Sequence, residues 1–336
     1  MTDKERFVPD EGLAPASTSM PAAAGPLDDL STPPRSQWRD VWDQFNRHKG
    51  AVFGGGFLIF ITLFVLIGPF IWTLEATKLD IRAKDMRPIW TAIWDGDAKV
   101  GWGHPLGTDQ LGRDLLSQMI EGGRASLAVG WAAMVLALLL GTLIGVLSGF
   151  FRKLDFWLMR FTDLVLSLPI LPLLLVAVTL FRQPLRANFG PETGMFILIV
   201  GVVGLTSWMQ TARIVRADVL ALKEREFILA ARSIGTTPGK IITRHLLPNV
   251  LSPIMVSATL GLATAIITES ALSFLGVGFP SDFPTWGKLL ADAVQRMEEY
   301  PERVLLPGIA ISLTVLAVNF LGDGLRDALD PRIRGR

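Results

Sequence analysis

Six long apolar runs dominate this sequence and decide what the chain can fold into. They lie at about residues 51–72, 125–151, 162–181, 194–210, 251–275 and 304–322. A helix rises about 1.5 Å per residue, so a run of about 20 apolar residues crosses the roughly 30 Å hydrocarbon core of a bilayer. Inside lipid, a helix satisfies its backbone polar groups within its own segment. The predicted fold is therefore an all-α integral membrane protein with about six transmembrane helices.

The composition agrees with this class of protein. Half of the 336 residues are hydrophobic, 19% are charged and the mean hydropathy is +0.42. That is more apolar sequence than the core of one soluble domain needs. The chain has no cysteine, which excludes disulfides, a thiolate nucleophile and cysteine-ligated metals. Its histidines, His48, His104 and His245, form no metal-ligand pattern, so we predict no metal and no cofactor bound by this chain.

Basic residues are distributed unevenly between the two sets of connecting segments. Segments 1–50, 151–162, 211–250 and 324–336 hold 20 Lys and Arg against 14 Asp and Glu. Segments 74–124, 182–193 and 276–303 hold 12 against 14. Cytoplasmic loops of membrane proteins are enriched in Lys and Arg. The first set and both termini are therefore expected in the cytoplasm, as in a multi-pass protein of the bacterial inner membrane.

The transmembrane domain is expected at 51–323, between flanking segments of other kinds. Residues 1–34 are rich in Pro, Ala, Ser and acidic residues without periodicity, which predicts a disordered cytoplasmic tail. Residues 35–50 carry aromatic and aliphatic side chains at helical spacing opposite a polar face. This pattern predicts an amphipathic helix lying on membrane lipid, with packing against a soluble partner as the alternative. Residues 324–336 are expected to form a cytoplasmic tail.

Two features inside the transmembrane domain predict local structure. Pro169 and Pro172 should kink the third span near its cytoplasmic end. In the basic loop 211–250, residues 226–234 have helical spacing, and Phe227, Ala230, Ala231 and Ile234 fall near one face. Gly235 is expected to end this helix and Pro238 to begin a second one. The loop therefore predicts a helix, a glycine turn and a helix at the membrane surface.

This loop resembles the cytoplasmic EAA loop of ABC import permeases. The resemblance rests on Ala230 and Ala231, on Gly235 after a further three residues, and on the later Leu246, Leu247 and Pro248. In that family the loop supplies a coupling helix that sits in a groove of the ATP-hydrolysing subunit. The resemblance implies that the contacts are made by Glu226, Leu229, Ala230, Ala231, Gly235, Leu247 and Pro248.

Two positions depart from the family pattern in this loop. Leu229 stands where the family has glutamate, and His245 stands where it usually has isoleucine. Glu226 lies one helical turn before Leu229 and is expected to replace the missing carboxylate in part.

Further segments resemble permeases of the dipeptide, oligopeptide and nickel branch of ABC importers. They are HPLGTDQLGRDLLSQMIEGGRASLAVG at 104–130, TESALSFLGVGFPSDFPTWGKLLADA at 268–293 and LAVNFLGDGLRDALDPR at 316–332. The resemblance is to the second, C-type permease of a peptide-type system, and it implies a type I ABC importer permease fold. It also implies a homologous second permease, two ATP-binding subunits that hold ATP and Mg, and an extracytoplasmic solute-binding protein. The implied cargo is peptides, with nickel chelates, glutathione, sugars or opines as alternatives.

Other functional classes lack their motifs in this sequence. There is no GxxxxGK[ST] phosphate loop, so this chain is not expected to bind ATP itself. No catalytic constellation occurs in a plausible setting, which predicts a non-catalytic subunit. The basic residues flank the spans and are not interleaved with aromatics, which argues against nucleic-acid binding. A secondary transporter is the alternative from another class, and it would need ion-coupling acids near the midplane.

Asp163, Glu269 and Asp323 lie within or at the ends of spans. Asp163 and Asp323 are near cytoplasmic ends and are expected to be solvated or paired with Arg160 and Arg326. Glu269 is deeper, and intramembrane acids are candidates for function. It either lines the translocation path or contacts a neighbouring helix.

The motif GTDQLGRD precedes the second span and contains Asp109, Arg113 and Asp114. Local salt bridges among these residues are expected to order the external segment. The three side chains are predicted to hold the fold and not to touch substrate.

Overall fold

The computed structural model describes residues 37–93, 96, 99–280 and 282–329. The tail predicted at 1–34 and residues 330–336 lie outside this part. Six described helices are long and apolar enough to cross a membrane, which confirms the predicted fold class. They are α2 Lys49–Ile71, α3 Leu115–Phe150, α5 Ile170–Phe189, α6 Pro191–Leu222, α10 Leu251–Phe274 and α12 Pro301–Leu329.

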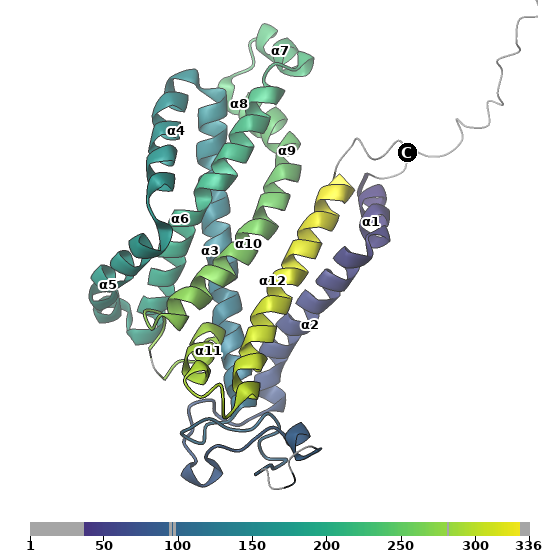
Figure 1. Cartoon of the computed structure of the whole chain (residues 1–336). Helices are drawn as coiled ribbons and strands as arrows, with labels where there is room; N and C mark the ends of the chain where they lie inside the picture. The colour runs from purple at the N-terminus through teal and green to yellow at the C-terminus, as the bar shows by residue number, and fades with distance from the viewer. Residues whose placement is uncertain (1–36, 94–95, 97–98, 281, 330–336) are drawn as a thin grey trace, which may run out of the picture.

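Shorter elements gather toward the two ends of this helix bundle. They are α1 Gln37–Arg47, the 3-10 turns η2 Ile81–Ala83 and η3 Ile89–Ile93, α4 Arg152–Ser167, α7 Glu226–Ser233, α8 Pro238–Ile241, the π-helical turn η4 Ile242–Leu246, α9 Leu247–Asn249 and α11 Trp286–Val294. Figure 1 shows α7 at one end, and α11 with the irregular segment 72–114 toward the other. We call these ends the α7 face and the α11 face.

The pair α3 and α6 makes the most extensive helix–helix contact in the described part of the chain. Gly141, Gly145 and Gly149 recur every four residues and so form one stripe along α3. A Cβ at Gly145 would lie 2.7 Å from the backbone oxygen of Ala212 on α6. Small residues at this spacing let two membrane helices approach closely, and the stripe positions α6 against α3.

A second helix pair, α2 and α12, packs beside this core (Figure 1). Gly54 of α2 faces the Ala317 backbone of α12. The helix predicted at 35–50 corresponds to α1, which contacts α12 and α2 and leaves Trp42 63% exposed. Its placement on lipid stays a prediction.

The third predicted span, 162–181, differs from the helices observed there. Leu168 and Pro169 have extended backbones and separate α4 from α5, so the helix is interrupted where only a kink was expected. The reason is local, because proline forces the preceding residue toward extended angles and itself lacks an N–H. α5 then continues to Phe189, beyond the predicted end of the span.

The predicted loop 211–250 also differs, because α6 continues as a helix to Leu222. Val215 and Val219 are fully buried. They pack against the glycine stripe of α3, Val215 against Gly145 and Val219 against Gly149. Arg213, just before Val215, and Arg216, between Val215 and Val219, form ion pairs with α4. The charged residues that indicated a loop therefore occupy one side of an amphipathic extension of the helix.

Candidate functional site

The basic segment on the α7 face contains two short helical stretches joined by a glycine turn. Gly235 follows α7 with a φ of 78°, in the left-handed region that glycine adopts without strain. The Gly235 N–H donates to the Arg232 oxygen at 2.9 Å, and the Thr236 N–H donates to the Ala231 oxygen at 3.0 Å. These bonds form a Schellman C-cap. Pro238 then begins α8, where its missing N–H costs nothing.

One side of α7 anchors this segment to the long helices. Ile228 and Ala231 are 0% and 6% exposed. Ile228 joins Ile241 and Leu246 in a buried cluster that also contains residues of α3 and α6. The helical spacing groups Ala231 with Phe227 and Ile234, yet the Phe227 and Ile234 side chains are 43% and 82% exposed. Ile228 was missed, although its spacing of three residues from Ala231 was a usable signal.

The predicted coupling residues are divided between the exposed and buried sides. Glu226, Leu229, Ala230, Gly235 and Pro248 are exposed, Leu247 is half-buried and Ala231 is buried. Leu229 is 45% exposed. We call the exposed apolar residues of α7 and its C-cap, Phe227, Leu229, Ala230 and Ile234, the α7 surface. Large apolar side chains gathered on an exposed surface mark an interaction site.

Two ion pairs brace α6 against α4 next to this segment. Arg216 donates to Asp155 at 2.5 and 2.7 Å. This hydrogen bonding holds the pKa of the Asp155 carboxyl below its ordinary value. Arg213 donates to Asp163 at 2.5 Å. The pairing alternative for Asp163, with Arg160, is therefore wrong, because the partner comes from α6, 50 residues away. Half of the Asp163 side chain is exposed, which agrees with the solvated alternative.

Asp323 and Arg326, the second expected pair, are both exposed on α12. The structure thus agrees with the solvated alternative for Asp323.

Glu269 is 0% exposed and lies in the second half of α10. The Ser273 hydroxyl donates to its carboxylate at 2.8 Å. Nearby, the buried Trp286 of α11 donates its indole N–H to the Met119 oxygen of α3 at 3.0 Å. Gly287 approaches α10 so closely that a Cβ added to it would clash with the Ser270 oxygen. The observed contacts of Glu269 belong to helix packing, and a role in translocation stays a prediction.

A groove of about 410 Å³ lies between the α4–α5 junction, α6 and α10. Hydroxyl and amide side chains line much of it: Thr206, Ser207, Gln210, Thr211, Ser257, Thr264 and Thr268. Glu269 is not part of this lining. The groove was not predicted from the sequence, although Ser257, Thr264 and Thr268 repeat at helical spacing within an apolar run.

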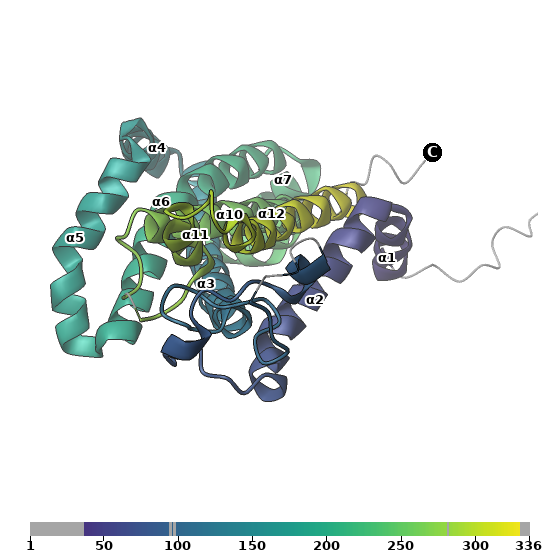
Figure 2. The same ribbon diagram turned by 60° about the horizontal axis from the view of Figure 1, so that its bottom comes forward.

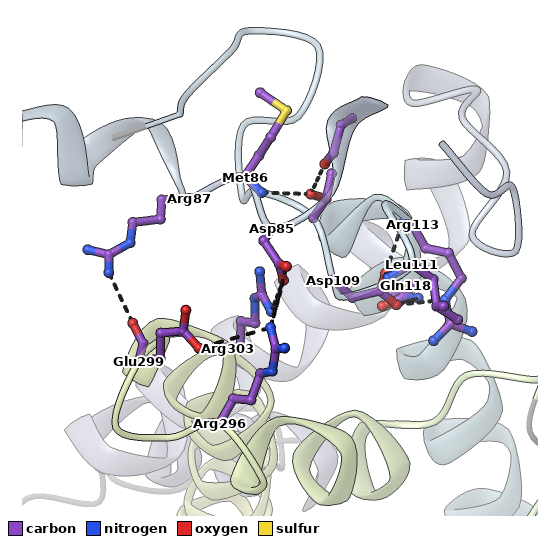
Figure 3. A network of polar contacts seen from close by, with 12 residues as sticks. Asp85, Met86, Arg87, Asp109, Leu111, Arg113, Gln118, Arg296, Glu299 and Arg303 are labelled. Atoms are coloured by element: carbon purple, nitrogen blue, oxygen red, sulfur yellow. Dashed lines mark hydrogen bonds and ion pairs between the residues drawn. The ribbon is translucent and has the colours of Figure 1, made fainter. Parts of the chain in front are cut away.

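On the α11 face, Asp109 and Asp114 organise the turns that precede α3. Asp109 pairs with Arg113 at 2.6 Å and accepts a hydrogen bond from Gln118 at 3.2 Å (Figure 3). Asp114 caps α3 by accepting from the Ser117 N–H at 2.8 Å. The expected local salt bridge is thus present, and these side chains order the segment. No group of three or more His, Asp or Glu residues suited to a metal occurs in the described ranges.

With this geometry in place, comparison with known proteins identifies the family. Residues 137–335 match the family described as the binding-protein-dependent transport system inner membrane component. The chain belongs to this family. Residues 36–88 also match the N-terminal transmembrane domain of oligopeptide transport permease C. The chain is thus a multi-pass permease of the bacterial inner membrane and a non-catalytic component of an ABC transport system.

Curated relatives align with the permease over nearly its full length. The dipeptide transport system permease protein DppC of Alkalihalophilus pseudofirmus is 37% identical over 96% of this chain and 99% of its own. The oligopeptide transport system permease protein OppC of Haemophilus influenzae is 36% identical over 92% of this chain and 93% of its own. The oligopeptide transport system permease protein OppC of Bacillus subtilis is 33% identical over 97% of this chain and 99% of its own.

A solved structure of the inward-facing MetNI methionine ABC transporter has a related fold. Its matching chain gives a TM-score of 0.52 at 19% identity and aligns with 63% of this permease and 97% of itself. This similarity supports only the fold of the permease, which is that of a type I ABC importer.

Proposed function

We propose that this permease carries short peptides across the inner membrane as part of an ATP-driven importer. The observation that supports a peptide cargo is the similarity to relatives named dipeptide and oligopeptide permeases, at 33% to 37% identity. Those alignments span at least 92% of this chain, so they include the membrane helices that a cargo must pass. Nickel chelates, glutathione or another small solute are the alternative cargoes for the same type of importer.

The proposed assembly contains a homologous second permease, two ATP-binding subunits and an extracytoplasmic solute-binding protein. ATP and Mg belong to the ATP-binding subunits, since this chain lacks a phosphate loop. We place the α7 face in the cytoplasm because the segments on that side are basic. Figure 1 shows α1 and the end of α12 toward the same side as α7, which agrees with cytoplasmic termini.

In this assembly the α7 surface docks on an ATP-binding subunit. Ile228 and Ala231 fasten α7 to the long helices, while Leu229 and Ile234 face outward. A displacement of the ATP-binding subunit is therefore passed to α3 and α6 through packed side chains, because such contacts resist compression. Leu229 makes an apolar contact where the family has a carboxylate, and Glu226 retains a negative charge one turn away.

The groove between α6 and α10 is the part of the transport route that this chain supplies. Two threonines of its lining donate to their own helix, Thr264 to the Leu260 oxygen at 2.9 Å and Thr268 to the Thr264 oxygen at 2.7 Å. Each hydroxyl oxygen retains acceptor capacity after donating its proton. A lining of this kind accepts peptide N–H groups without selecting the charge of the side chains.

Uptake by cells tests the cargo. The gene is deleted in its host, and the uptake of radiolabelled trialanine, nickel and glutathione is measured with and without a plasmid-borne copy. We expect trialanine uptake to fall upon deletion and to return with the plasmid. Unchanged trialanine uptake together with loss of nickel or glutathione uptake would contradict the peptide assignment.

Reconstitution separates an importer from a secondary transporter. The complex that co-purifies with the tagged chain is placed in liposomes with ATP supplied at the α7 face. Transport is expected to require ATP and the co-purifying ATP-binding subunits. Transport by the chain alone without ATP would overturn the importer mechanism for this protein.

A further inference from the structure

A cavity of about 290 Å³ on the α11 face is separate from the groove and from the α7 surface. The end of α5, the start of α6 and the connection from α10 to α11 border it, and its lining includes Arg182, Arg186 and Lys288. Figure 2 shows the connection from α10 to α11 on the side of α11 that faces α5. Arg182 is 12 residues after Ile170, which lines the groove, so the cavity lies about 18 Å farther along α5.

Positive charge exceeds negative charge in this cavity. Arg182, Arg186 and Lys288 contribute three cations, while Asp282 is the single acid in the lining. Lys288 pairs with Asp292 at 3.3 Å and keeps 23% of its side chain exposed. In the described part of the chain, neither arginine lies within ion-pair distance of a carboxylate.

The arginines have donor capacity that the protein leaves unused. Arg182 donates from Nη2 to the Gly278 oxygen at 3.0 Å, but its Nε is buried without a partner among the described residues. The Arg186 side chain, in the last turn of α5, forms no hydrogen bond with the described residues. Like charges brought together at a partly desolvated site repel, and a buried donor without a partner is unfavourable. An oxyanion in the cavity relieves both effects.

The size of the cavity limits what it holds. Ligand pockets commonly occupy about 300–1,000 Å³, so a cavity of about 290 Å³ suits a small solute or one end of a larger one. Arginine binds carboxylate oxygens through paired N–H donors. The lining thus suits a terminal carboxylate together with the residue that bears it.

We propose that the cavity formed by Arg182, Arg186 and Lys288 binds the carboxylate of the transported solute on the external side of the permease. This inference rests on the proposed function and adds a chemical requirement to it, namely a free carboxylate on the cargo. A phospholipid phosphate carries the same oxyanion chemistry and is the competing source of the anion.

Binding to the full-length chain tests the site without requiring transport. The chain is purified into phosphatidylcholine nanodiscs and titrated by calorimetry with L-alanyl-L-alanine and with L-alanyl-L-alaninamide, which lacks the carboxylate. We expect the acid to bind at least about tenfold more tightly than the amide. Arg186→Gln, which breaks no side-chain hydrogen bond or ion pair with the described residues, and Arg182→Gln/Arg186→Gln should each weaken binding of the acid and leave binding of the amide unchanged.

Lys78→Gln is the matched control, because Lys78 is an exposed cation outside the cavity, and it should bind the acid as the native chain does. Equal binding of acid and amide, no binding of either, or unchanged binding by both arginine variants would overturn the proposal. Displacement of the dipeptide by phosphatidylglycerol added to the nanodiscs would assign the cavity to lipid phosphate and also overturn it. Failure of the cellular uptake test contradicts the peptide cargo, whereas failure of this titration contradicts the anion site.

Discussion

Arg303 donates from Nη1 to the Asp85 carboxylate at 3.0 Å, although 218 positions separate the two residues along the chain. Arg303 lies in the first turn of α12 and is 5% exposed. Arg296 reaches the same carboxylate at 3.4 Å (Figure 3). One aspartate therefore joins the irregular segment 72–114 to the corner between α11 and α12.

Replacing Asp85 with asparagine should destabilise the α11 face. Asp85 has a φ of 58°, which asparagine tolerates, so Asp85→Asn removes the charge without straining the backbone. The buried Arg303 then loses its ionic partner, at a cost of about 1–3 kcal/mol in the free energy of unfolding. Thermal unfolding of the purified protein in detergent measures the change. Glu75→Gln, at an exposed position, is the control, and an equal loss of stability in both variants would refute the role of the ion pair.

Adding one methyl group to the α3 stripe should separate α3 from α6. In Gly145→Ala the new Cβ would meet the Ala212 oxygen at 2.7 Å, whereas at Gly201 nothing lies within 4 Å. Overpacking of this kind costs about 1–3 kcal/mol. Gly145→Ala is expected to lower the unfolding temperature while Gly201→Ala leaves it nearly unchanged. Identical unfolding temperatures for the two variants would contradict the close approach of the helices.

The Asp155–Arg216 pair predicts a pH-dependent contribution to stability. The pKa of Asp155 is lowered in the folded protein from its ordinary value of 3.8, chiefly by the hydrogen bond from Arg216. The folded state therefore binds this proton less readily, so the stabilisation is present above pH 3.8 and is lost as the pH falls through the lower folded value. Asp155→Asn should be less stable than the native protein at pH 7, and the difference should narrow below about pH 4. A difference independent of pH between 7 and 3 would exclude the ionic contribution.

Gly235→Pro should uncouple ATP hydrolysis from uptake. Proline cannot adopt the φ of 78° at this position, and it removes the N–H that donates to Arg232. The C-cap of α7 is lost, while the spans and their insertion are unaffected. A bulky replacement such as Ala231→Trp is expected to act similarly, because it expels α7 from its buried cluster. We expect the assembled complex to retain ATP hydrolysis and to lose at least about 90% of uptake. Such a loss corresponds to an increase of roughly 1.4 kcal/mol or more in the activation free energy of uptake.

Gly239→Ala is the control for that experiment, because the added Cβ has no neighbour within 4 Å and the glycine has no positive φ. Its uptake should match that of the native permease. Normal uptake by a correctly assembled Gly235→Pro complex would remove the coupling role from this segment.

Much of the fold followed from local patterns in the sequence. The apolar runs predicted six membrane helices because a backbone in lipid must form its hydrogen bonds within its own segment. The turn after α7 was equally local, since Gly235 donates to a residue three positions earlier and Thr236 to one five positions earlier. Asp109 and Arg113, four residues apart, form the expected salt bridge.

The sequence by itself determined the membrane class, the helical segments and the family motifs, because each depends on residues close together in the chain. Only the tertiary structure decided that Asp163 pairs with Arg213 and that α6 continues along α3. It also brought Arg182, Arg186 and Lys288 into one cavity. These outcomes depend on which helix faces lie together. Packing and charge pairing between distant segments set that arrangement, and no local periodicity records it.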